Sequence, residues 1–260
     1  MKNQHLNYCR QALKQFAQSP AAVNDFQKEY QPSAAKMLSV AEKFMLPLGG
    51  RLFDDKHYKA MDETEALRLP FQVIALEYAS ATDKNFSRRI LLAIDYENSD
   101  SIVVMPIIHD DKKSIWFCLP PAFIPRIGYL SRENATKEEV PFVVNMPDGI
   151  EGQEYGCEIG TLLCLLNTLQ CSNVHLEKRK AKANTKVKNA LPFDDYYVLS
   201  VDSKQPISNI SGGGTHRSPR EHLRRGHIRR LETGRKIWVN AAVIGAGKGA
   251  GKITKDYLVN

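Results

Sequence analysis

The sequence lacks the features of several specialised protein classes. No apolar run approaches the roughly 20 residues that span a bilayer, and Met1–Leu6 lacks the apolar core of a signal peptide. No internal repeat is visible, and a composition of 43% hydrophobic and 25% charged residues argues against wholesale disorder. We therefore expect a globular cytoplasmic protein with no membrane partner.

Cysteine is scarce and poorly spaced for a disulfide or zinc framework. The chain has five cysteines, an odd number, with no C-x-x-C pair. Cys157, Cys164 and Cys171 are spaced by seven residues, about two helical turns, which predicts that they share one helix face. Buried thiols in a reducing compartment are the expected result, and no metal site is predicted from them.

A nucleotide-binding loop is also missing. Residues 245–252 alternate glycine with alanine or lysine, but a phosphate loop needs G-x-x-x-x-G-K followed by Ser or Thr and then a helix. Ile253 stands where the hydroxyl residue would be. We expect no cofactor, although the glycine N–H groups and the two lysines could contribute to a polyanion site.

The patterns that are present predict an α+β fold with three parts. Residues 1–50 form a helical cap of three helices, the second starting at Pro20 and the third running from Pro32–Ser33 to Met45. Residues 51–210 form a mostly antiparallel central sheet with one long helix, because short polar loops separate apolar runs. The expected strands are 69–78, 89–96, 102–108, 114–119, 141–145 and 194–201, the helix is 153–170, and the prolines of 120–125 indicate an irregular loop.

The third part, residues 211–260, is predicted to be a basic helix–hairpin packed on the body. Ser218-Pro219-Arg220-Glu221 fits a capping box, which predicts a short helix over 219–225. A strand from His227 to Leu231, a tight turn at 232–235 and a return strand over 236–244 should follow. Both faces of the return strand are largely apolar, so this segment should pack on another part of the fold.

The net charge of +7 is unevenly distributed. Residues 176–189 hold six Lys and Arg against one Glu, and residues 212–260 hold eleven against three acids. These segments therefore carry +5 and +8, which leaves −6 for the remainder. Such asymmetry is typical of a protein that binds a polyanion, and a solubilising charged face is the alternative.

Arginine grips phosphate with two parallel hydrogen bonds, so the basic tail predicts contacts with a nucleic-acid backbone, RNA slightly ahead of DNA. The basic loop 176–189, expected to be mobile and exposed, would add a second patch. The candidate binding residues are Arg217, Arg220, Arg224, Arg225, Arg229, Arg230, Arg235, Lys236, Lys178, Arg179 and Lys180.

Three histidines lie within this tail. His222 and His227 could act as the acid and base of metal-independent RNA cleavage, with arginine stabilising the transition state. Alternatively they are hydrogen-bonding or structural residues. A metal site that also uses His216 is disfavoured by the surrounding cations. The carboxylates, Glu77 and Asp95 near strand ends among them, lack the spacing of a two-metal nuclease and are interpreted as solvated charge.

The tail resembles a family of bacteriophage and mobile-element proteins. The matching residues are 218–230, Gly234, 238–240 and 255–257, with weaker matches at 69–71 and 77–78. The resemblance implies a phage-type setting in a bacterial host cell and interference with a host process. It assigns no catalytic residue. We therefore expect a nucleic-acid-binding protein, with a ribonuclease or toxin, or an inhibitor that docks on an acidic host protein, as alternatives.

Overall fold

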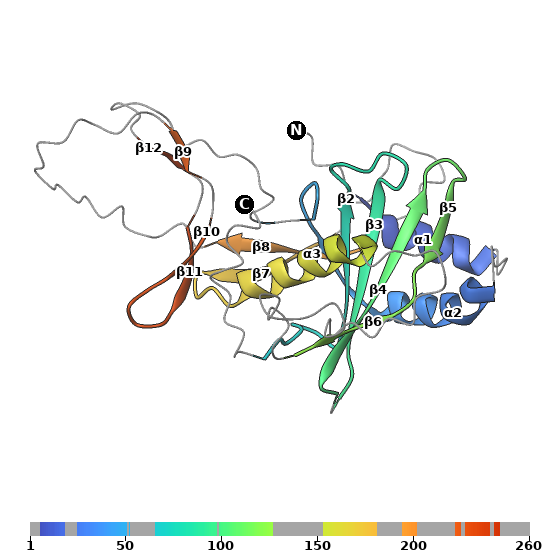
Figure 1. The fold of residues 1–260 in the computed structure, drawn as a ribbon, viewed down its shortest axis with the longest axis horizontal. Coiled ribbons are helices and arrows are strands. Elements are labelled where there is room, and N and C mark those ends of the chain that lie inside the picture. Colours follow the sequence, from blue (N-terminus) through green and yellow to red (C-terminus); the bar gives the residue numbers. More distant parts are fainter. Residues whose placement is uncertain are drawn as a thin grey trace, which may run out of the picture.

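The computed structural model describes residues 6–18, 25–50, 52, 66–97, 99–126, 153–180, 194–201, 222–224, 227–239 and 242–244. The fold is α+β, as the sequence predicts: a mixed sheet with helices on both faces (Figure 1). Among the described helices, none is long and apolar enough to cross a membrane.

The N-terminal helices differ from the prediction at two points. Helix α1 spans Tyr8–Gln18 as expected, but α2, Asp25–Val40, continues through Pro32, where we had predicted that a new helix begins. Glu42–Met45, assigned to the third helix, instead form strand β1. Their apolar spacing fits a helix, but a strand in the middle of a sheet buries both of its faces, and Phe44 and Met45 are both buried.

Eight strands form the main sheet, in the order β5-β4-β3-β2-β1-β8-β7, with β6 also paired to β4. All neighbours are antiparallel except β1, which runs parallel to both β2 and β8. The predicted irregular loop at the prolines is wrong in part, because Ala122–Pro125 pair with β4. The predicted strand 141–145 lies outside the described residues. The strands are β2 Val73–Ala79, β3 Arg88–Asp95, β4 Ser101–Asp110, β5 Ile115–Cys118, β6 Ala122–Pro125, β7 Val174–Arg179 and β8 Tyr196–Val201.

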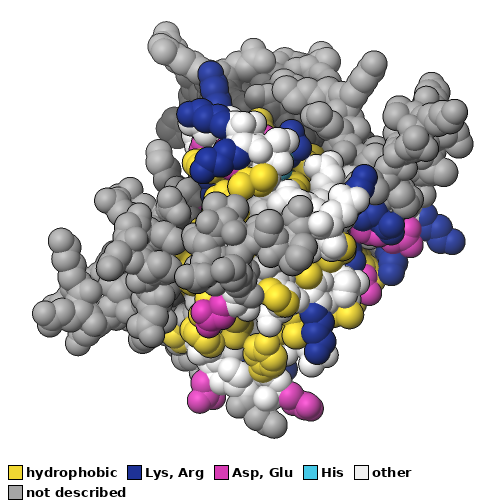
Figure 2. Space-filling view, turned by 90° about the vertical axis from the view of Figure 1, so that its right-hand side faces the viewer, with side chains coloured by type: hydrophobic (Ala, Val, Ile, Leu, Met, Phe, Trp, Pro, Cys, Tyr) yellow, Lys and Arg dark blue, Asp and Glu magenta, His cyan; other side chains and the backbone are white. Residues whose placement is uncertain are grey.

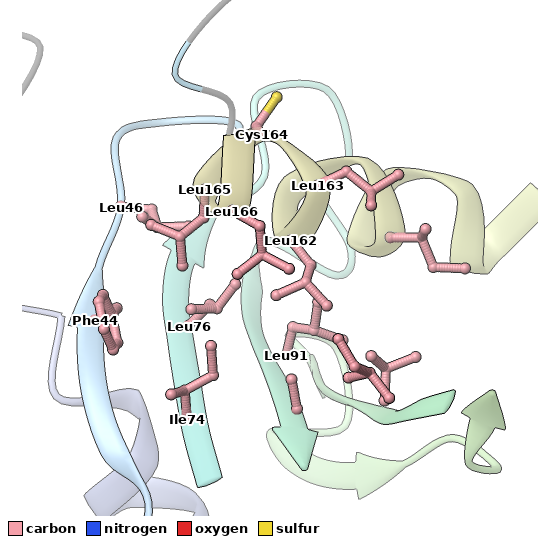
Figure 3. Packing of buried hydrophobic residues seen from close by; sticks show 14 of the residues in the cluster. Phe44, Leu46, Ile74, Leu76, Leu91, Leu162, Leu163, Cys164, Leu165 and Leu166 are labelled. Carbon is pink, nitrogen blue, oxygen red and sulfur yellow. The ribbon is translucent and has the colours of Figure 1, made fainter. Parts of the chain in front are cut away.

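Alternating side chains of the sheet feed two hydrophobic cores. Ile74, Leu76 and Leu91 pack against α3, Gln153–Leu169, whereas Ala75 and Leu92 pack on the opposite face with α1 and α2. Figure 3 shows the leucines of α3 above Leu76 and Leu91. The long helix was predicted almost to the residue.

The described cysteines are buried as expected, but Cys171 lies beyond the end of α3, so the prediction that it shares a helix face with Cys164 is wrong. Cys9, Cys118, Cys164 and Cys171 are buried free thiols, and the side chain of Cys157 lies outside the description. Burial raises the pKa of both Cys118 and Cys171 to about 12. Such thiols are packing residues rather than nucleophiles.

The C-terminal part contains two further strand pairs. Strands β10, His227–Arg230, and β11, Lys236–Val239, form the predicted hairpin, but the predicted return strand over 236–244 is too long, because residues 242–244 pair elsewhere. The predicted helix is wrong for His222–Arg224, which form strand β9 and pair with β12, Ala242–Ile244. The capping-box pattern lies just before β9 in the sequence. Its partner β12 contains the β-branched residues Val243 and Ile244, which favour strand pairing.

Candidate nucleic-acid interface

The hairpin turn follows from its sequence. Leu231 and Arg235 close it, with the Leu231 N–H donating to the Arg235 carbonyl at 2.8 Å. Gly234 has φ = +80°, a conformation that costs glycine little and other residues more. The turn therefore fixes the register in which Ile228 faces Trp238.

The hairpin is anchored to the body by apolar and polar contacts. Ile228 and Trp238, 7% and 4% exposed, belong to the same core as α3. The Asn173 amide pairs with the backbone of Trp238 like a strand residue: its Oδ1 accepts from the N–H at 2.7 Å, and its Nδ2 donates to the carbonyl at 2.9 Å. The Ser172 N–H adds a bond to the Lys236 carbonyl at 2.9 Å. The hairpin is thus a docked, ordered element.

Lys236 belongs to this anchor. It is buried at 6% exposure, and its Nζ donates to Gln170 Oε1 at 2.6 Å. A buried ammonium that is committed to an internal acceptor is poorly placed to reach a phosphate. We therefore leave Lys236 out of the proposed phosphate contacts, although its sequence position suggested that role.

Three predicted arginines lie exposed on the hairpin. Arg229 and Arg230 are in β10, and Arg235 precedes β11, where its guanidinium donates to Ser172 Oγ at 3.2 Å. Neighbouring residues of a strand point to opposite faces, so Arg229 and Arg230 project on opposite sides of the hairpin. Together with Lys236 they give residues 227–239 a charge of +3, because Glu232 is the single acid in that range.

The second predicted patch is a strand rather than a mobile loop over its first residues. Lys178 and Arg179 end β7, and Lys180 follows as an exposed residue. Residues 181–189 of that loop lie outside the described residues. The hairpin docks on residues 170–173, just before β7 begins, so the two basic groups lie at opposite ends of this strand.

The charges at the end of β7 are partly balanced. Lys178 Nζ lies 3.7 Å from Glu42 Oε2, and an Arg179 guanidinium nitrogen lies 2.9 Å from Glu177 Oε2. Each ion pair offsets one positive charge locally. The field that this end offers to a polyanion is therefore reduced.

The structure leaves the histidine hypothesis open. His222 lies opposite Ile244 in the β9–β12 pair, and His227 lies opposite Val239 in the hairpin. The side chains of both, and that of Arg224, lie outside the description. Arg217, Arg220, Arg225 and His216 are not among the described residues at all.

Sequence reasoning missed two buried polar groupings. Glu77, expected to be solvated, is buried, and its Oε1 accepts the Cys9 N–H at 2.8 Å at the start of α1. Burial raises the pKa of this carboxyl group, and its contacts with Cys9 oppose the shift. Glu158 likewise pairs with Arg89 at 2.5 Å between α3 and β3, and burial raises its pKa against the effect of Arg89.

A pocket of about 310 Å³, its open mouth included, lies beside Glu77. Arg10 binds Asp194 on one side of it, and the α1 N-terminus binds Glu77 on another. Both carboxylates therefore have partners within the fold, and we assign no ligand to the pocket. Its lining consists of Leu6, Asn7, Lys43, Phe44, Met45, Glu77, Asp194 and Tyr196.

A histidine–aspartate pair near β5 also has a structural role. Asp111 accepts from Ser87 N at 2.9 Å and Oγ at 2.5 Å, and from His109 Nδ1 at 2.9 Å. Burial acts to raise the pKa of Asp111, but these hydrogen bonds outweigh it and lower the pKa overall. Because Ser87 contacts the aspartate, this is not the order of a nucleophile and its base. Within the described ranges, no three His, Cys, Asp or Glu side chains are grouped as metal ligands.

Comparison with protein-family models, with curated proteins and with solved structures found no match.

Proposed function

We propose that the protein binds nucleic acid through the sugar–phosphate backbone, with Arg229, Arg230 and Arg235 as phosphate contacts. The observation that carries the proposal is the display of these exposed arginines on a hairpin whose Ile228 and Trp238 are fixed in the core. A docked support lowers the entropy lost when guanidinium groups order around phosphates. The tail resembles a family of bacteriophage and mobile-element proteins, and in such a setting the binding would serve to interfere with a host process.

The charge pattern of another face provides a contrast. Figure 2 shows the side of the molecule that carries α1, α2 and β5, where basic and acidic side chains lie among hydrophobic ones. Mixed charges of this kind suit solubility rather than polyanion binding. Exposed lysines in the part of the molecule formed by β2 to β5 can therefore serve as matched controls.

The test compares two triple variants that each lower the net charge from +7 to +4. One replaces Arg229, Arg230 and Arg235 with alanine, and the other replaces Lys84, Lys112 and Lys113. Binding of labelled single- and double-stranded RNA and DNA is measured by fluorescence anisotropy over a series of salt concentrations. With about 0.7 counterions released per phosphate of a single strand, we expect the arginine variant to flatten the salt slope by about 2.

Equal losses in the two variants would reduce the effect to net charge and contradict the proposal. The same reactions, made in EDTA and run on denaturing gels, also test cleavage. RNA fragments that disappear with His227→Ala would favour the ribonuclease alternative. No binding to any of the four nucleic acids would contradict the proposal and favour an acidic protein partner.

A further inference from the structure

Three side chains stand in a row across β1, β8 and β7, at the end of β7 remote from the hairpin. Phe44 is paired in register with Tyr197, and Tyr197 with Lys178. Directly paired residues of neighbouring strands point to the same face. Phe44 is 1% exposed, Tyr197 is half-buried and Lys178 is exposed, so the row leads from the core to the sheet edge.

The Tyr197 ring lies between the other two members of this row. Its centroid is 5.4 Å from that of Phe44 with only 25° between the ring planes, and Lys178 Nζ lies 5.3 Å from the Tyr197 centroid. Phe44 and Lys178 come from strands on opposite sides of β8, so they flank the ring from opposite sides. The Phe71 ring also packs against Tyr197 in a tilted arrangement, with 5.0 Å between the two ring centroids.

The outer side of this ring faces the edge of the described sheet. Strand β7 is the last strand of the described sheet, and Lys178 is 47% exposed. Figure 3 shows Phe44 to one side of the α3 leucines, which lie over Leu76 and Leu91 instead. Among the described residues, the flexible Lys178 side chain lies over the Tyr197 ring on the side of the sheet edge.

We infer that this outer face of Tyr197 is a stacking site for one base of a single-stranded nucleic acid. A base there would extend the Phe44–Tyr197 stack by a third ring, and the displaced Lys178 would exchange its ion pair with Glu42 for the adjacent phosphate. Duplex bases are stacked inside the helix and do not offer this face. The inference rests on the proposed function, and it specifies the form of nucleic acid that is bound.

The position of the site fits a strand that also contacts the hairpin. At about 3.3 Å per residue, β7 covers about 17 Å from Val174 to Arg179. A single strand that follows the β7 edge would therefore have the hairpin arginines at one end and Tyr197 at the other. The hairpin would supply charge, and Tyr197 would supply a contact to a base.

The test uses two probes with the same number of phosphates: oligothymidylate and an abasic oligonucleotide that lacks bases. We expect Tyr197→Leu to weaken oligothymidylate binding about five- to 100-fold and to leave binding of the abasic probe unchanged. Tyr196→Leu is the matched control, because Tyr196 lies on the opposite face of β8. Tyr197→Phe keeps the ring and should retain the affinity for oligothymidylate.

Two other outcomes separate the claims. If Tyr197→Leu weakens both probes equally, or neither, the stacking site is overturned while backbone binding stands. If wild-type protein binds neither these probes nor the RNA and duplex DNA of the preceding test, the proposed function fails, and the stacking site fails with it. Should Tyr197→Leu not fold, 2-aminopurine placed along the oligonucleotide decides with the wild-type protein: quenched fluorescence at one position supports stacking, and no quenching at any position overturns it.

Discussion

The two basic ends of β7 differ in how their charge is supported. The hairpin carries +3 over residues 227–239, and its apolar side chains are fixed in the core. At the other end, Lys178 and Arg179 lie close to Glu42 and Glu177, and an aromatic ring adjoins the lysine. With similar counts of Lys and Arg, one end is proposed to contact phosphates and the other to contact a base.

The largest expected effect on stability comes from a change that weakens the support of the hairpin and leaves its charge unaltered. Trp238→Ala removes a buried aromatic side chain and should lower the free energy of unfolding by about 3–5 kcal/mol. Urea denaturation followed by circular dichroism measures it. A change below about 0.5 kcal/mol, typical of a surface site, would contradict the docked hairpin.

Asn173→Ala should have the next largest effect on stability. It removes both hydrogen bonds to the backbone of Trp238 and leaves those groups to find other partners, which costs about 1–3 kcal/mol. The same denaturation experiment reports it. Ser172→Ala is the control, since it removes only the exposed contact from Arg235 and should be nearly neutral.

Alkylation of Cys171 offers a local measure of hairpin docking. Its pKa of about 12 leaves roughly one thiol in 10,000 as reactive thiolate at pH 8, and Cys118 has the same pKa in the core on the other face of the sheet. Iodoacetamide labelling read by mass spectrometry should therefore be slow at both sites. In Asn173→Ala we expect about five- to 100-fold faster labelling of Cys171 alone. Equal acceleration at Cys118 would indicate global unfolding instead.

The smallest effect should come from the ion pairs at the end of β7. Lys178→Gln and Arg179→Gln each break a partly exposed pair, worth less than about 1 kcal/mol of stability. Thermal melts at low and high salt measure it. A loss above 2 kcal/mol from either change would show that this end is as firmly supported as the hairpin.

Local patterns in the sequence predicted the hairpin well. Glycine at the turn and the apolar run of the return strand determine it within about a dozen residues. The long helix was predicted equally well, because its leucines repeat along one short segment. Such elements depend on neighbours in the chain, and the sequence displays those neighbours directly.

The remaining features depend on contacts between distant segments. Phe44 was assigned to a helix because its spacing from other apolar residues fits both structures, and only its pairing with Leu76 and Tyr197 decides for a strand. Asn173 and Glu77 gave no local signal, since their partners lie 65 and 68 residues away. The Phe44–Tyr197–Lys178 row likewise joins three strands, and no short sequence motif predicts that these strands are neighbours in the sheet.

The position of β1 also has a consequence during synthesis. It is the strand that joins β2 to β8, so without it the sheet would divide into a block of β2 to β6 and a block of β7 and β8. Its register partner Tyr197 leaves the ribosome 153 residues after Phe44. At about 5–20 residues per second, the nascent chain carries the outer edge of β1 without β8 for roughly 8–30 s. A synonymous change that slows translation before residue 197 would lengthen the period in which this edge can pair with another chain.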